Sequence, residues 1–331
     1  MYGRSKFNAQ CTCNIRERAT MKYINILNLF GNYSISGAIL VLFLAAAPAH
    51  ADESLFAYAI GSDTQQKGRG EASIRLTDRF DKDAGRYNGL DILFGAEYGV
   101  SNRLSIGVDF EIFKLNYKDA FAQIQTSPGV FQDFYEPQFN KTKVGRYGFN
   151  VKYQISSPYT SKIGVAINTE LYYRPNFGRV DGSKQKQLSF EPSLILQKNF
   201  RNDTIVTLLN IKAEIETVKN RQYKIATIDA NEIKFEPTAG ISYRFARNLY
   251  IGAEGFYRAD NANGKFNHDS LFLGPTFHYG GKNFYITATF LRQLTGSPTY
   301  AYSTSDFFIG RGVNLEEETR NEARLKVGFN L

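Results

Sequence analysis

Apolar and polar residues alternate with a period of two along most of this chain, and this pattern constrains the fold more than any other feature. Between Leu104 and Ile112, apolar residues occupy every second position, with Ser, Gly, Asp and Glu between them. Successive side chains of a β-strand point to opposite faces, so the pattern predicts a strand with one apolar and one polar surrounding. It recurs about a dozen times, to the last residue.

We interpret twelve of these segments as tilted strands that cross a bilayer. No apolar run after residue 51 is long enough for a membrane-spanning helix. The predicted strands cover about residues 70–78, 90–98, 104–112, 147–155, 163–171, 188–196, 205–216, 235–245, 249–257, 271–279, 284–290 and 325–331.

The connections between the predicted strands alternate in length. The short ones, rich in Gly, Asn, Asp, Ser and Pro, are 99–103, 156–162, 199–203, 246–248 and 280–283. The long ones are about 118–142, 174–186, 218–231, 259–269 and 293–322. Short turns on the periplasmic side and long loops outside are typical of outer-membrane barrels. The prediction is an all-β, antiparallel, up-and-down transmembrane barrel of about 12 strands, with both termini periplasmic.

The N-terminal part has the organisation of an exported protein. Residues 21–51 read as a secretory signal peptide, with an apolar stretch at 37–47 and a small-x-small cleavage site at 49–51. Residues 1–20 are then an upstream extension or follow a misassigned start codon; a membrane anchor is the alternative. Residues 52–69 are a periplasmic tail or an inward plug, because an even strand number excludes another spanning strand. Residues 70–331 form the predicted barrel.

Composition removes several classes of function. Both cysteines, Cys11 and Cys13, precede the cleavage site, so the exported chain has no disulfide and no thiolate metal ligand. The leader also holds five basic residues against one acidic residue, so it carries much of the net charge of +8. We therefore predict no nucleic-acid partner, no cofactor and no metal.

Two short stretches resemble a known group of proteins. They are Lys67-Gly68-Arg69-Gly70-Glu71 and the hairpin from Glu97 through Tyr98-Gly99-Val100-Ser101-Asn102-Arg103 to Leu104. Both are similar to an uncharacterised family of Gram-negative outer-membrane β-barrels, and to outer-membrane proteins assigned to a phenol-degradation pathway. In this chain Ser101-Asn102 replaces the usual Thr-Asp, and Trp is absent. The resemblance covers about forty residues and implies a barrel fold.

The polar face of the predicted strands carries many charges, which point away from lipid, where a midplane charge costs about 2–4 kcal/mol. Either these charges line a water-filled path, or opposite charges pair and fill the interior; the mixed signs argue against strong ion selectivity. The candidates that line the lumen are Arg75, Asp91, Glu97, Asp109, Glu111, Lys152, Glu170, Glu191, Lys212, Glu214, Glu236, Arg244, Glu254, Arg258 and Arg324.

Three smaller motifs have structural interpretations. Glu191-Pro192 and Glu236-Pro237 predict bulges or strand starts near the outer rim, since Pro lacks a ladder donor. His268 and His278 are the only histidines after the leader; His278 has no Ser nearby in sequence and His268 lies at a loop–strand junction, so a hydrolase is a weak alternative. Aromatic residues beside the short turns predict a girdle at the lipid boundary. They are Tyr98, Tyr153, Tyr243, Phe245, Tyr250, Tyr279 and Phe284.

The expected function is a narrow outer-membrane channel for passive uptake of small or partly hydrophobic solutes. The alternative is a non-conducting barrel that works through its external loops. Two aromatic-rich loops could gate the mouth or simply pack on each other: one holds Phe121, Phe131, Phe134, Tyr135 and Phe139, and the other Tyr300, Tyr302, Phe307 and Phe308. Expected partners are outer-membrane lipid and the barrel-assembly machinery, which would engage the C-terminal strand ending at Leu331.

Overall fold

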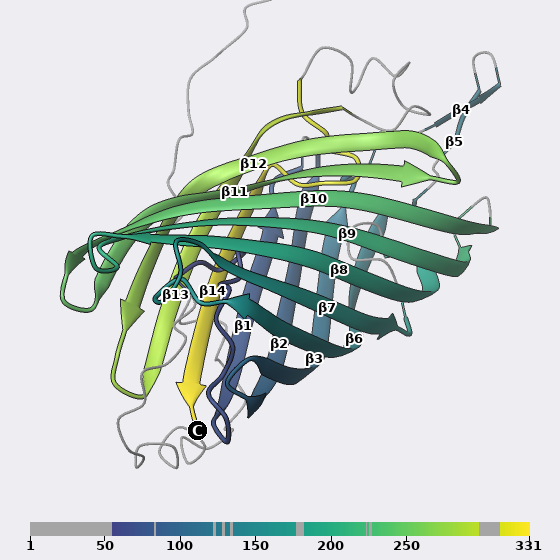
Figure 1. The fold of residues 1–331 in the computed structure, drawn as a ribbon. Coiled ribbons are helices and arrows are strands. Elements are labelled where there is room, and N and C mark those ends of the chain that lie inside the picture. Colours follow the sequence, from purple (N-terminus) through teal and green to yellow (C-terminus); the bar gives the residue numbers. More distant parts are fainter. Residues whose placement is uncertain are drawn as a thin grey trace, which may run out of the picture. The chain divides into compact units, whose positions relative to one another are not determined.

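Twelve antiparallel strands form a closed barrel in the computed structural model (Figure 1). The structure describes residues 55–82, 84–121, 124–127, 130–132, 135–176, 182–222, 224, 227–297 and 312–331. All of them lie in Leu44–Leu331, the second of two compact units; the first is Met1–Phe43. The predicted leader and the loop aromatics Phe134, Tyr300, Tyr302, Phe307 and Phe308 lie outside the described residues, as does the side chain of Phe131.

Each barrel strand pairs with its neighbours in chain order, and β1 closes the wall against β14 from Glu71↔Asn330 to Phe80↔Asn321. The barrel strands are β1 (Gly70–Phe80), β2 (Arg86–Ser101), β3 (Leu104–Lys118), β6 (Gln138–Ser156), β7 (Gly164–Arg174), β8 (Lys184–Phe200), β9 (Ile205–Gln222), β10 (Thr227–Ala246), β11 (Leu249–Ala262), β12 (Lys265–Gly280), β13 (Phe284–Ser297) and β14 (Asn321–Asn330).

The short β4 (Ile124–Ser127) and β5 (Val130–Gln132) pair only with each other, and in Figure 1 they project beyond the barrel wall. We call the end of the barrel that holds the β3–β6, β7–β8 and β13–β14 connections the loop end. The opposite end, with the tight β2–β3 and β10–β11 connections and the C-terminus, is the turn end. The described residues contain no helix of the length and hydropathy needed to span a membrane.

The predicted antiparallel β-barrel and all twelve predicted strands are confirmed, and the periplasmic place of both termini stays a prediction. Two predicted long loops are wrong. β9 continues to Gln222 and β10 begins at Thr227, so most of 218–231 is strand. Likewise, β11 and β12 meet at a tight turn in which Asn263 and Gly264 have φ of 51° and 77°. Asn-Gly favours such turns because both positions need positive φ. In these extensions polar residues occupy both faces, and the period of two is lost.

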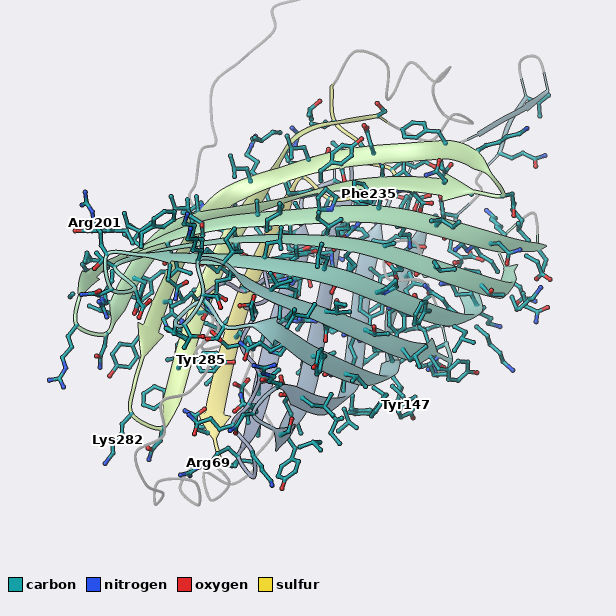
Figure 2. The ribbon with its side chains drawn as sticks, in the orientation of Figure 1. Arg69, Tyr147, Arg201, Phe235, Lys282 and Tyr285 are labelled. Carbon is teal, nitrogen blue, oxygen red and sulfur yellow. The ribbon has the colours of Figure 1, made fainter. Side chains whose placement is uncertain are left out.

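The outer face of the barrel is apolar and exposed. Val108 is 56% exposed and Phe94 41%, whereas Glu111 on the inner face is 1% exposed. Figure 2 shows the side chains, including Tyr147 at 51% exposure on the outer surface. Such a continuous apolar surface is far larger than soluble monomers present to water.

The predicted aromatic girdle is only partly correct. Tyr98, Tyr153, Tyr243 and Phe245 are each about half exposed on the outer face beside the turns. Tyr250 instead belongs to the inner face, and its ring centroid lies 5.6 Å from that of His278. The prediction is wrong for Tyr250 because closeness to a turn in sequence does not determine which face of the barrel wall a side chain lies on.

The Glu-Pro motifs interrupt ladders in the middle of strands, so their predicted place near the outer rim is wrong. Pairing between β8 and β9 jumps from Phe190↔Ile215 to Ser193↔Lys212, across Pro192. Between β10 and β11 it jumps from Phe235 to Thr238, across Pro237. Each proline lacks the N–H that one ladder needs, and the strand continues because its other neighbour still pairs.

Candidate functional site

The segment 55–67 lies inside the barrel and follows the inner wall. Its backbone faces side chains that point inward, and these side chains form hydrogen bonds with it in order around the barrel. Ser105 of β3 accepts from Gln65 N (2.8 Å), and Gln197 of β8 accepts from Ser62 N (2.8 Å). The inward side chains that bond this inner segment come from six strands: Ser105, Gln154, Gln197, Asn210, Glu254 and Arg324.

Glu254 on β11 is the strongest anchor of the inner segment. Its carboxylate accepts the backbone N–H groups of Ala57, Tyr58 and Ala59 at 3.0, 2.9 and 3.1 Å. Thr289 donates a fourth hydrogen bond, at 2.5 Å. Hydrogen bonds to an ionised acceptor are roughly twice as strong as neutral ones, so this carboxylate holds three consecutive peptide units.

Apolar and cation–π contacts add to this anchoring. Phe56 is 1% exposed and packs with Ala59 and Leu208, so its burial stabilises the segment by about 2 kcal/mol. A Cβ at Gly240 would stand 2.5 Å from the Phe56 ring, so only glycine leaves room for it. The Arg324 guanidinium lies 3.3 Å from the centroid of the Tyr58 ring.

Ion pairs join many of the predicted lumen charges. Lys212 on β9 lies between Glu191 of β8 and Glu236 of β10, at 3.1 and 3.0 Å, so the two Glu-Pro motifs place carboxylates on one lysine. Arg258 then reaches Glu236 at 2.5 Å. Because alternation turns these side chains inward and the register brings them within reach of one another, they form one chain of charges across the four strands β8 to β11.

A second set of pairs lies on the wall formed by β14, β1, β2, β3 and β6. Arg79 bridges Asp91 (2.8 Å) and Glu322 (3.2 Å). Further pairs of this wall are Arg324–Glu322 at 2.8 Å, Arg146–Asp109 at 3.5 Å, Arg146–Glu111 at 3.8 Å, Lys152–Glu97 at 3.6 Å and Lys326–Glu71 at 3.8 Å.

The other candidates have different surroundings. Glu214 accepts a hydrogen bond from Tyr172, and Glu170 accepts one from Asn168 at 3.1 Å. Within the described part of the chain, no carboxylate forms an ion pair with Arg75. Arg244 is half-buried at the turn end and donates to the carbonyl of Asn202 at 2.7 Å, away from the ion-pair chain.

Sequence reasoning missed several charges that complete these networks. Arg79 and Arg146 lie just outside the predicted strands, and extending the alternation by one residue would have turned both inward. Glu318 lies in the β13–β14 connection, where no periodic signal exists. It reaches Arg258 at 2.5 Å because residues 312–320 fold back onto the barrel, with Leu315 and Asn314 buried.

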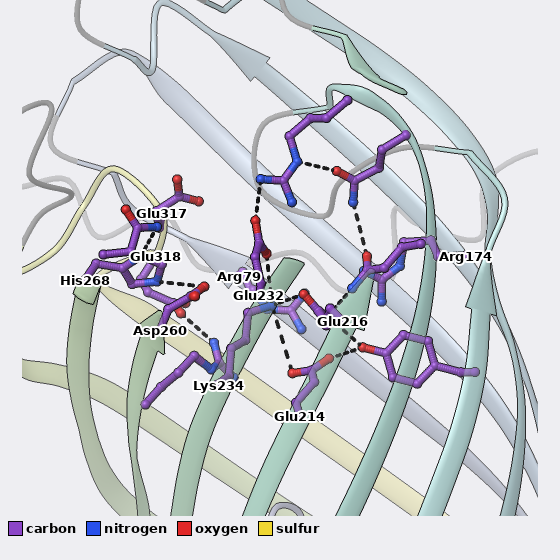
Figure 3. A pocket seen from close by; sticks show the side chains of 16 residues that line it. Arg79, Arg174, Glu214, Glu216, Glu232, Lys234, Asp260, His268, Glu317 and Glu318 are labelled. Carbon is purple, nitrogen blue, oxygen red and sulfur yellow. Dashed lines mark hydrogen bonds and ion pairs between the residues drawn. The ribbon is translucent and has the colours of Figure 1, made fainter. Parts of the chain in front are cut away.

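Between this connection and strands β7–β12 lies a charged cavity of about 160 Å³ (Figure 3). Lys234 reaches Glu216 at 2.6 Å within it, and Asp260 faces His268 at 3.9 Å. Acids and bases are nearly balanced along its lining, so the middle of the interior carries little net charge.

Two larger hollows lie at the ends of the barrel. The hollow at the turn end has a volume of about 1090 Å³ and is lined by Arg69, Arg244, Arg247 and Lys282, with the carboxylates of Asp63 and Asp203. Figure 2 shows Arg69 and Lys282 at this end. The hollow at the loop end has a volume of about 1100 Å³ and lies between the β3–β6 and β8–β9 strands.

His278 and the loop aromatics Phe121 and Tyr135 pack against neighbouring side chains. His278 is fully buried, with its Nδ1 atom 2.8 Å from the Thr287 hydroxyl. Phe121 packs on Tyr135, with ring centroids 4.3 Å apart. This contact is of the loop-on-loop kind that the sequence analysis gave as one of two alternatives. Among the described residues, no three His, Cys, Asp or Glu side chains are grouped to hold a metal ion.

Comparisons with known proteins identify the fold and the family. The outer-membrane channel COG4313 from Pseudomonas putida F1 matches with a TM-score of 0.52 at 7% identity, over 82% of this chain and 98% of that one. The NanC porin matches with a TM-score of 0.44 at 10% identity, over 78% and 100% of the chains. At this identity the likeness shows a shared outer-membrane barrel fold.

A further match is the translocator domain of the autotransporter NalP from Neisseria meningitidis, with a TM-score of 0.43 at 8% identity, over 79% and 87% of the chains. No curated protein sequence matches the chain significantly. The likeness to phenol-degradation proteins stays a prediction. The model of a family of unknown function, DUF6662, matches residues 48–331, so the chain belongs to that family.

Proposed function

We propose that this member of the DUF6662 family is an outer-membrane channel for small polar solutes, narrowed by its own inner segment. The observation that carries the proposal is the arrangement of the interior. A hollow of about 1000 Å³ opens at each end, and residues 55–67 cross the polar interior between the two. A polar lining favours polar solutes. It disfavours the partly hydrophobic solutes that were also expected from the sequence.

Topology and export follow from the same proposal. The signal peptide at 21–51 takes the chain across the inner membrane, and the barrel-assembly machinery engages β14. Tight turns then face the periplasm and the loop end faces outward, which is the usual arrangement for such barrels. The inner segment enters from the periplasmic side and serves as an inward plug, which is one of the two predictions made for residues 52–69.

The competing proposal is a non-conducting barrel, and the dense ion pairing of the interior supports it. Pairs such as Arg79–Asp91, with both side chains below a tenth exposed, remove charge from water and fill space. The two proposals differ in whether the inner segment can be loosened to open a path, which a recording can decide.

The Glu254→Gln variant should conduct more often than the wild-type protein in planar bilayers. The amide keeps the shape but loses the negative charge that holds three peptide N–H groups, so the inner segment is held less tightly. Open-channel probability is the measured quantity, and Asp119→Asn, at an exposed position of the β3–β6 connection, is the matched control. Equal behaviour of both variants would count against anchoring by Glu254, and silence of every variant would favour the non-conducting barrel.

A further inference from the structure

The hollow at the loop end is a cleft in the wall, and the unequal lengths of the strands create it. β7 has 11 residues, whereas β6 has 19 and β8 has 17. β6 pairs with β7 only from Tyr147 onward, so its first residues rise above the end of β7. The β3–β6 and β8–β9 strands therefore stand on either side of a gap.

Asn176 crosses the floor of this gap. Its side chain donates to the carbonyl of Val144 in β6 (2.8 Å), and its carbonyl accepts from Gln185 N in β8 (2.9 Å). These bonds to both flanking strands fix the width of the cleft at its base. The cleft is therefore built by the strands themselves.

Positive charge dominates the lining of the cleft. Seven Lys and Arg side chains line it, against the single carboxylate of Glu136. In the interior of the barrel most bases are neutralised by carboxylates, but within the described residues six bases of the cleft form no ion pair: Arg86, Lys118, Lys141, Lys143, Lys184 and Lys186. Concentrated like charge in a concave site attracts anions.

The charges are repeated along two strands. Lys141 and Lys143 on β6, and Lys184 and Lys186 on β8, are each two residues apart. That spacing is about 7 Å along a strand. A ligand with several charges at intervals fits this arrangement better than a single small anion does.

The rest of the lining favours a sugar. Seven Asn and Gln side chains line the cleft, among them Asn116, Gln138 and Asn140. Amides both donate and accept hydrogen bonds, as hydroxyl groups require, whereas phosphate or sulfate uses donors alone. Phe139 also lines it: its partly buried ring stacks on the buried ring of Tyr117, with the centroids 5.7 Å apart, and offers an apolar surface to a sugar ring.

We propose that this cleft binds an anionic oligosaccharide, a short chain of sugar acids. Lysines pair with the repeated carboxylates, the amides bond the hydroxyls, and the site concentrates the ligand at one mouth of the barrel. The proposal that such sugars are the solutes of the channel rests on the proposed function. The proposal that the cleft binds them does not.

Calorimetry on the detergent-solubilised protein tests the site without any need for conduction. The probes are an alginate-derived tetrasaccharide with one carboxylate per sugar, neutral maltotetraose and inorganic tripolyphosphate. We expect the acidic tetrasaccharide to bind, more weakly as salt is raised, and the neutral one to show no binding. Absence of binding by the acidic tetrasaccharide, or equally tight binding of tripolyphosphate, would overturn the assignment.

Two matched quadruple variants locate the binding. Replacing Lys141, Lys143, Lys184 and Lys186 with Gln should weaken tetrasaccharide binding at least about tenfold, since four charge-assisted contacts are lost. Replacing the exposed Lys114, Lys162, Lys198 and Lys265 with Gln removes equal charge elsewhere and should leave affinity unchanged. Equal loss in both variants would refute the cleft. If the wild-type protein conducts but does not bind the tetrasaccharide, only the proposed binding site is overturned. If it binds the tetrasaccharide but does not conduct in planar bilayers, only the proposed channel is overturned.

Discussion

Deletion of residues 55–66 should raise the single-channel conductance of the barrel several-fold. The segment crosses the interior, and six strands bind it through inward side chains. Its removal leaves those polar side chains facing water in an open lumen. The twelve-stranded ladder does not include the segment, so the barrel should still fold, with the loss of about 2 kcal/mol from Phe56 burial.

The matched control for this deletion is removal of residues 124–132. These residues form the separate β4–β5 sheet, which pairs with no barrel strand. Conductance of this control should equal that of the wild-type protein. If the inner deletion also conducts like the wild-type protein, residues 55–66 do not set the width of the path.

The Val108→Arg substitution should destabilise the barrel strongly. Val108 lies at the centre of the outward apolar run of β3 (Leu104–Ile112), is 56% exposed, and pairs with Ala96 and Phe149. Arginine at the bilayer midplane costs about 2–4 kcal/mol, and near the interface about 0–1 kcal/mol. We expect the free energy of unfolding in lipid vesicles, measured by guanidinium titration, to fall by about 2–4 kcal/mol.

Val100→Arg is the control for this substitution. Val100 is also on the outer face, 42% exposed, but lies at the end of β2 beside the turn. Its variant should lose no more than about 1 kcal/mol. If both variants lose the same free energy of unfolding, the cost of arginine on the outer face does not depend on depth in a membrane.

Alternation could predict the strands because it records two different surroundings on the two faces. In β3, Ile106 and Val108 meet one surrounding while Gly107 and Asp109 meet the other, and the face of each is readable from sequence. At Lys219 and Asp229, in the β9–β10 hairpin, both faces are polar, and the strand was mistaken for a loop.

The site was harder to predict because its contacts join distant parts of the chain. Alternation turned Glu191, Lys212 and Glu236 inward, but only the register across β8, β9 and β10 places the two carboxylates on one lysine. The hydrogen bonds from Ala57 and Ala59 to Glu254 span nearly two hundred residues of sequence. No local pattern reports such contacts.

Quenching of tryptophan fluorescence by lipid tests most directly which face of the wall meets the membrane. The chain has no Trp, so single substitutions give an uncluttered signal. Leu273 and Phe272 are adjacent on β12 at the same depth, the first 48% exposed on the outer face and the second 1% exposed on the inner face. In vesicles with brominated acyl chains, Leu273→Trp should be strongly quenched and Phe272→Trp weakly. Equal quenching of the two would contradict a barrel with lipid outside and a protected interior.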